Sequence, residues 1–169
     1  MAEYILKTNN LCKKYKKQFA LFNLNITIKK GEIYGLIGQN GAGKTTLLRI
    51  ATGLTLPTRG TIELFGKSDK KGLINSLKRI GAVVESPALF PNMSAYENLE
   101  IHRLQKGIPN KKCIDKALEL VGLKNVGRKK AGNFSLGMKQ RLGIAIALLS
   151  DPECLILDER RNGLDPRRM

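Results

Sequence analysis

The chain has 169 residues, 42% of them hydrophobic, which suits a single domain with a buried core. It contains neither a run of about 18 apolar residues nor a long apolar N-terminal region, so we expect no membrane-spanning helix or signal peptide and a cytosolic location. The formal charge of +16 fits a solvated lysine-rich surface first, a membrane-adjacent face second and nucleic acid third, because only 5% of the residues are aromatic and could stack on bases.

The first half of the chain alternates short apolar runs with glycine turns, which is typical of strands bounded by tight turns. One helix interrupts this pattern, beginning at Lys44 and ending before Gly53. In chain order, the pattern predicts strands at residues 4–8, 24–28 and 33–37, a helix at 44–52 and a strand at 61–65.

The second half is mostly helical. Ser94 and Glu97 have the spacing of a capping box, and Gly107 ends the helix that they begin. In chain order, the pattern predicts a strand at 79–84, helices over about 94–107, 114–122 and 142–149, and a strand at 154–157. These elements predict an α/β domain with a helical insertion at roughly 86–133.

One stretch carries most of the functional information. Gly38-Gln39-Asn40-Gly41-Ala42-Gly43-Lys44-Thr45 fits G-x-x-x-x-G-K-[ST] and lies between a predicted strand and a predicted helix, the arrangement that cradles a nucleoside triphosphate. Lys44 would reach the β- and γ-phosphates and the Thr45 hydroxyl would hold Mg²⁺, so ATP and Mg²⁺ are the expected cofactors. A glycine turn that binds nothing is the weaker alternative. The expected nucleotide-binding residues here are Gly38, Gln39, Asn40, Gly41, Ala42, Gly43, Lys44, Thr45 and Thr46.

The strand at 154–157 ends in a pair of acids, Asp158 and Glu159. Asp158 would orient Mg²⁺, and Glu159 could polarise the attacking water as a catalytic base. Many buried strands end in an acid, so this pattern is weak by itself. Together with the glycine loop it indicates a P-loop nucleoside triphosphatase.

Between these two motifs lies Phe134-Ser135-Leu136-Gly137-Met138-Lys139-Gln140-Arg141, which resembles the Leu-Ser-Gly-Gly-Gln signature of the ATP-binding cassette (ABC) family. The resemblance covers nearly the whole chain. It implies a mostly parallel sheet with an N-terminal antiparallel β part, a single domain over 1–169 and a helical subdomain over about 86–150. It also implies that Ser135 and Gly137, at a helix N-terminus, contact the γ-phosphate of ATP held by a second such domain, in a head-to-tail homodimer or mixed pair.

Three further positions match this family residue by residue. Tyr15 stands where an aromatic ring stacks on adenine, although a strand-edge tyrosine is the alternative. Asp165 lies in a loop that resembles the one linking the two sites of the dimer. Glu85 stands where the family usually has Gln, and its carboxylate could serve in catalysis and reach Mg²⁺ or water. The expected metal-site residues are therefore Thr45, Asp158 and Glu85.

The segments Glu85-Ser86-Pro87 and Tyr96-Glu97-Asn98-Leu99, with the signature, are similar to one branch of the family. That branch contains the ATP-binding subunits of exporters that protect against bacitracin and lantibiotic-type peptides. The resemblance implies a peripheral ATPase at the cytoplasmic face of the membrane that powers export through separate transmembrane subunits and binds no nucleic acid. Two alternatives stay open: an ABC ATPase acting on ribosomes or nucleic acid, and a nucleotide-binding remnant with little hydrolysis.

Several features depart from the family pattern. Arg160-Arg161 replaces the usual Pro-Thr after Glu159 and could weaken that base or face solvent. The family's switch histidine has no counterpart, because the single histidine, His102, is expected to be an exposed residue of the inserted helix. Family members run on into further strands, one of which inserts between 33–37 and 154–157. We therefore expect a fold that is incomplete at its C-terminus, as in a fragment or truncated product.

Overall fold

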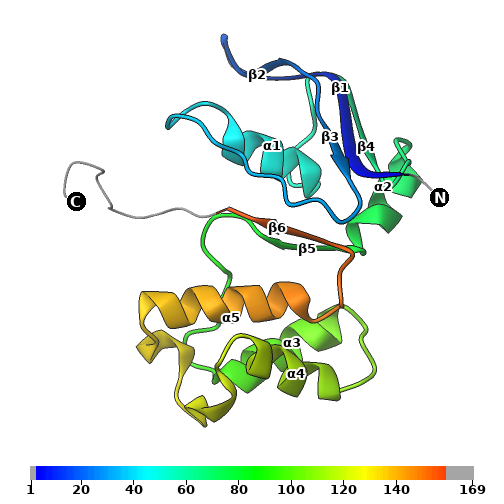
Figure 1. The fold of residues 1–169 in the computed structure, drawn as a ribbon. Helices are drawn as coiled ribbons and strands as arrows, with labels where there is room; N and C mark the ends of the chain where they lie inside the picture. The colour runs from blue at the N-terminus through cyan, green and yellow to red at the C-terminus, as the bar shows by residue number, and fades with distance from the viewer. Residues whose placement is uncertain (1–2, 159–169) are drawn as a thin grey trace.

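The computed structural model describes residues 3–158. Figure 1 shows three parts stacked along the molecule: an antiparallel sheet with two short helices, a pair of parallel strands, and a group of helices. Of the predicted site residues, Glu159 and Asp165 lie outside the described residues, as does the Arg160-Arg161 pair.

The antiparallel sheet is organised around its first strand, which pairs with the three others. Its strands are β1 (Tyr4–Tyr15), β2 (Gln18–Leu24), β3 (Thr27–Lys29) and β4 (Arg59–Leu64). Helices α1 (Lys44–Ala51) and α2 (Lys70–Leu77) lie against this sheet (Figure 1). Leu11 and Leu47 belong to the hydrophobic cluster between the sheet and α1, so this cluster fixes α1 relative to β1.

A parallel pair of strands separates this sheet from the helices. β5 (Ile80–Val83) and β6 (Cys154–Leu157) pair in register, and the Asp158 N–H continues the ladder to the Val83 carbonyl at 2.8 Å. Ile80 and Ile156 reach into the cluster under α1. Within residues 3–158, the expected parallel sheet consists of these two strands.

The predicted strand at 33–37 is not formed in the described part of the chain. Residues 33–37 have no regular secondary structure, and the side chains of Ile33 and Ile37 are 100% and 98% exposed. A strand requires a hydrogen-bonded neighbour, and β5 is the one strand paired with β6 among residues 3–158. This segment thus has the apolar pattern of a strand but no hydrogen-bonded neighbouring strand among residues 3–158.

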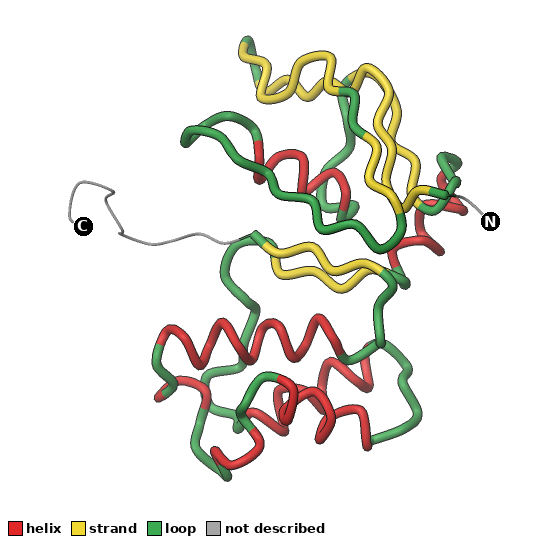
Figure 2. Tube along the Cα trace, in the orientation of Figure 1, coloured by secondary structure: helices red, strands yellow, loops and turns green. Residues whose placement is uncertain are grey.

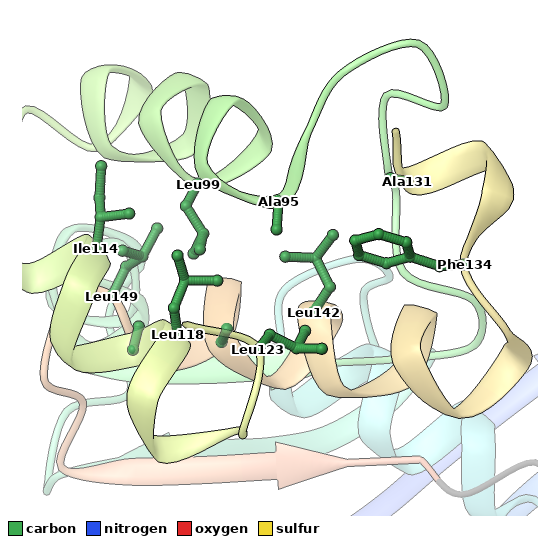
Figure 3. Close-up of a cluster of buried hydrophobic side chains, with 11 residues drawn as sticks. Ala95, Leu99, Ile114, Leu118, Leu123, Ala131, Phe134, Leu142 and Leu149 are labelled. Atoms are coloured by element: carbon green, nitrogen blue, oxygen red, sulfur yellow. The ribbon is translucent and has the colours of Figure 1, made fainter. Parts of the chain in front are cut away.

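The helical part has its own core, drawn in Figure 3. Leu99, Ile114 and Leu142 are fully buried and come from three different helices, so their packing holds the helices together. The helices are α3 (Ala95–Gln105), α4 (Lys112–Leu120) and α5 (Leu136–Leu148), with 3₁₀ turns η1 (Lys124–Val126) and η2 (Ala131–Asn133) before α5. α5 also packs on β5 and so connects the helices to the strands.

The capping box at the start of α3 is confirmed. The Ser94 hydroxyl accepts from the Glu97 N–H at 3.2 Å, and the Glu97 carboxylate accepts from the Ser94 N–H at 2.7 Å. This backbone hydrogen bond is the main cause of the lowered pKa of Glu97. Two helices differ from the sequence-based expectation, since α2 was not predicted and α5 begins six residues before the expected position at 142.

Asn98 joins α3 to the segment that leads into it. Its side chain is fully buried, accepts from the Phe90 N–H at 2.7 Å and donates to the carbonyls of Phe90, Met93 and Ser94 at 3.1, 3.3 and 2.9 Å. We expect Asn98→Ala to lower the free energy of unfolding by about 1–3 kcal/mol, because buried backbone groups lose their partners. Urea unfolding measures this, with the exposed helical Asn75→Ala as the matched control. Equal midpoints for the two variants would contradict the prediction.

An ion pair on α3 makes the stability of the helical part sensitive to acid. The buried Arg103 donates to both Glu100 carboxylate oxygens at 2.6 and 2.9 Å. These hydrogen bonds lower the pKa of Glu100 from 4.5 to about 2. The carboxylate therefore stabilises the fold above pH 4.5, and this contribution is lost as the pH falls from 4.5 to 2. We expect Glu100→Gln to make the urea-unfolding midpoint depend less on pH over this interval. Glu119→Gln, in an exposed pair with Lys124, should leave the pH dependence of the midpoint unchanged.

Candidate nucleotide site

The glycine loop at 38–43 runs directly into α1 and leaves the helix N-terminus open. Gly43 takes the N-cap position with a φ of 85°, and no described side chain caps the helix. Its N-terminal N–H groups are therefore available to an anion, and the helix dipole favours negative charge at this point. A Cβ on Gly43 would lie 2.2 Å from the carbonyl oxygen of Ala20, so the loop packs on the backbone of β2.

Lys44 folds back over the loop that precedes it. Its ammonium group donates to the carbonyls of Gly38 and Gln39 at 2.5 and 2.8 Å, and the Ala42 N–H donates to Gln39 at 3.2 Å. The positive charge thus lies inside the loop, beside the open helix N-terminus. This is the position from which an ammonium group can bind phosphate oxygens.

Thr45 and Asp158 meet across the site. The Thr45 hydroxyl, in the first turn of α1, donates to a carboxylate oxygen of Asp158 at 3.0 Å. A hydroxyl and a carboxylate are hard oxygen donors, the kind that Mg²⁺ uses together with phosphates and water. These two groups therefore fit Mg²⁺. Within residues 3–158 no cluster of three or more His, Cys, Asp or Glu side chains could hold a metal by itself.

Glu85 forms an ion pair with Arg49, which sequence reasoning did not identify. Arg49 lies one helical turn beyond Thr45, on the same face of α1. Glu85 has a φ of 69°, unusual for a residue with a side chain, so the chain bends sharply where β5 leads into the next segment. A cation facing this carboxylate offsets the negative charge that Glu85 adds near Asp158. The sequence signal for this ion pair was the Glu at position 85 in place of the usual Gln, because an added carboxylate near Asp158 requires a neighbouring cation.

Tyr15 ends β1 and pairs with Gln18 across the hairpin that contacts the glycine loop through Ala20. The residue is 45% exposed, and the Lys13 ammonium lies 5.1 Å from the ring centroid. Tyr15 is thus an exposed tyrosine at the end of β1, on the hairpin whose Ala20 contacts the glycine loop.

Ser135 and Gly137 lie on the other side of the β5–β6 pair, at the start of α5 (Figure 1). The Ser135 hydroxyl accepts from the Met138 N–H at 3.3 Å as an N-cap, and the space around Gly137 is open. The fold does not bring this helix start and the glycine loop of the same chain together. A helix N-terminus that carries a hydroxyl beside an uncrowded glycine is nevertheless suited to a phosphate presented from outside.

A cavity of about 480 Å³ lies between the antiparallel sheet and β6, next to Lys44 and Asp158. The segment containing Tyr34 and Leu36 also lines it. The expectation of an exposed His102 is wrong: the residue is half-buried, and its Nε2 atom is shielded from solvent and has no hydrogen-bond partner among residues 3–158. Three cysteines have free thiols: Cys12, Cys113 and Cys154.

These features together define a P-loop nucleotide-binding domain: a glycine loop, a lysine folded over it, an open helix N-terminus and a Thr–Asp pair beside them. The model of the ABC transporter family matches residues 21–162, and the chain belongs to that family. None of the helices in residues 3–158 has the length and hydrophobicity that crossing a bilayer requires.

Curated relatives agree with the predicted branch. The chain is 53% identical over 96% of its length to the bacitracin transport ATP-binding protein BcrA of Bacillus licheniformis, covering 53% of that protein. It is 46% identical over 96% of its length to the lantibiotic transport ATP-binding protein SrtF of Streptococcus pyogenes, covering 69% of it. The chain spans about half the length of the BcrA-type relatives.

Solved structures confirm the predicted fold class. cbiO1 from Clostridium perfringens, part of the ABC transporter complex cbiONQ, is 34% identical with a TM-score of 0.83, over 98% of this chain and 69% of that one. The ATP-binding cassette MJ0796 was solved as a dimer in a post-hydrolysis state with ADP and Pi. It is 29% identical with a TM-score of 0.82, and the match covers 96% of this chain and 77% of that one.

Proposed function

We propose that this chain binds ATP with Mg²⁺ and hydrolyses it, as the ATP-binding subunit of a transporter that exports its substrate through separate membrane subunits. The observation that carries this proposal is the placement of Lys44 and the Thr45–Asp158 pair around the open N-terminus of α1. Lys44 binds the β- and γ-phosphates, and Tyr15 stacks on adenine. When bound, Mg²⁺ would neutralise charge on the phosphate oxygens.

The remaining site residues have distinct proposed roles. Thr45 and Asp158 would hold Mg²⁺, and Glu159 activates the attacking water. Glu85, paired with Arg49, would be available to the metal site or to water. Ser135 and Gly137 bind the γ-phosphate of the nucleotide on a second ATP-binding domain, and Asp165 lies in the loop between the two sites. This arrangement explains why α5 begins away from the glycine loop of its own chain.

We propose a helical subdomain over about 86–150, supported by the separate core around Leu99 and Leu142. It would transmit closure of the domain pair to the transmembrane subunits at the cytoplasmic face of the membrane. Peptide antibiotics of the bacitracin or lantibiotic type are the proposed cargo, because relatives with 46–53% identity carry those names. The proposal includes no nucleic-acid partner.

Phosphate release by the purified protein tests the reaction. Comparison with Glu159→Gln is decisive, because Gln keeps the shape of Glu but cannot accept a proton. A much lower rate for Glu159→Gln supports the proposal, and equal rates contradict it. Cofractionation with membranes that increases when the cells also produce the membrane subunits supports the transport role, and cofractionation with ribosomes contradicts it.

A further inference from the structure

The hairpin formed by β1 and β2 ends in a turn that carries two lysines. Tyr15 pairs with Gln18, so Lys16 and Lys17 alone form the turn, and Lys16 has a φ of 52°. Two-residue turns of this kind usually contain Asn-Gly or a similar pair, because side chains such as that of lysine are strained at positive φ. The turn lies at the periphery of the molecule (Figure 2), where it holds two ammonium groups in solvent.

Two phenylalanines lie beside this turn on β2. The rings of Phe19 and Phe22 contact each other edge to face at 5.1 Å, and their side chains are 47% and 72% exposed. The Lys14 ammonium lies 5.3 Å from the centre of the Phe19 ring. We call Lys14–Phe22 the lysine–phenylalanine hairpin. Exposed aromatic rings surrounded by ammonium groups are typical of protein surfaces that contact the headgroup region of a bilayer.

The charge around this hairpin has one sign. Residues 4–31 contain seven lysines and no Asp or Glu. The neighbouring strand adds another cation near the turn, because Arg59 on β4 is paired with Cys12 on β1. This surface is therefore complementary to an anionic partner.

We propose that the lysine–phenylalanine hairpin docks on an anionic lipid surface. Insertion of the two rings among the headgroups would remove them from water, and Lys14, Lys16 and Lys17 would face the lipid phosphates. Single-stranded nucleic acid fits less well, because the Phe19 and Phe22 rings contact each other at an interplanar angle of 74° and so do not form parallel platforms for successive bases. This inference goes beyond the proposed function, in which membrane subunits alone recruit the chain.

The hairpin's lipid contact is separable from nucleotide binding. Lys13 is left out of the lipid-binding set, because it contacts the ring of Tyr15, the proposed adenine-stacking residue, and donates to the Leu56 carbonyl at 2.7 Å. Phe22, Lys16 and Lys17 do not line the cavity beside Lys44 and Asp158. Variants at these three positions should therefore bind Mg²⁺-ATP as the parent protein does.

Cosedimentation of the purified protein with lipid vesicles tests the proposal without any transporter subunit. We expect binding to phosphatidylglycerol-containing vesicles but not to pure phosphatidylcholine vesicles, and weaker binding at high salt. Lys16→Gln/Lys17→Gln and Phe22→Ser should each weaken binding by about tenfold or more. The matched controls are Lys70→Gln/Lys71→Gln, which removes the same charge from exposed positions at the start of α2, and Leu120→Ser, which removes an exposed apolar side chain.

Equal losses in the hairpin variants and their controls would overturn the proposal, because net charge or general hydrophobicity would then explain the binding. So would unchanged vesicle binding in variants that lose affinity for a single-stranded RNA probe. Binding of Mg²⁺-ATP, measured on the same samples, shows that each variant is folded. Failure of the proposed ATPase function would leave the vesicle result unaffected, so the two proposals are judged separately.

Discussion

Lys44→Ala is expected to weaken Mg²⁺-ATP binding by about 10²–10⁴-fold, the largest effect of any substitution considered. A hydrogen bond to a charged group contributes about 1.5–3 kcal/mol, and Lys44 would contact two phosphates. Each 1.4 kcal/mol corresponds to a factor of ten in affinity. Without nucleotide, the Lys44 ammonium bonds to loop carbonyls that are exposed to solvent, so its loss should change stability little.

Titration of the purified protein with a fluorescent ATP analogue, with and without Mg²⁺, measures this effect. Lys71→Ala is the matched control, because it removes one exposed positive charge away from the site. The urea-unfolding midpoint of Lys44→Ala should stay near that of the parent protein, which separates lost binding from lost folding. Parent-like affinity in Lys44→Ala would refute the nucleotide site itself.

The sequence alone could predict this site because its main signals are local. The glycine loop, Lys44 and Thr45 are contiguous, and a loop that leads into a helix positions all of them together. The capping box of Ser94 and Glu97 is equally local, and the structure contains both of its hydrogen bonds. Thr45 and Asp158 were both assigned to the Mg²⁺ site from their motifs, and in the structure their side chains are hydrogen-bonded to each other at 3.0 Å.

Features that depend on distant parts of the chain were harder to predict. Residues 33–37 have a strand's apolar pattern, but pairing is a property of two segments, and residues 3–158 supply no neighbour there. Helix α2 was not predicted because it contains Gly72, and glycine has a low helix propensity. The Asp69 carboxylate nevertheless caps α2 by accepting from the Gly72 N–H at 2.9 Å. The Arg49–Glu85 pair joins two elements whose proximity follows only from the fold.

Gly43→Ala should be the most damaging single substitution for the geometry of the loop. At a φ of 85°, an alanine costs about 1–2 kcal/mol in backbone strain. Its Cβ would also lie 2.2 Å from the Ala20 carbonyl oxygen and 2.8 Å from Leu21 Cδ2, so the loop and β2 must move apart. This movement carries the N-terminus of α1 with it, and we expect Mg²⁺-ATP affinity to fall by more than about tenfold through loss of alignment.

Gly41→Ala separates the two causes of this loss. Gly41 has a φ of 87°, nearly that of Gly43, but nothing lies within 4 Å of the Cβ that alanine would add. In urea unfolding without nucleotide, both variants carry the same backbone strain, and Gly43→Ala alone also carries the clash with Ala20. We therefore expect a clearly lower midpoint for Gly43→Ala than for Gly41→Ala. Equal midpoints would mean that β2 does not support the glycine loop, because the close contact at Ala20 would then have no energetic consequence.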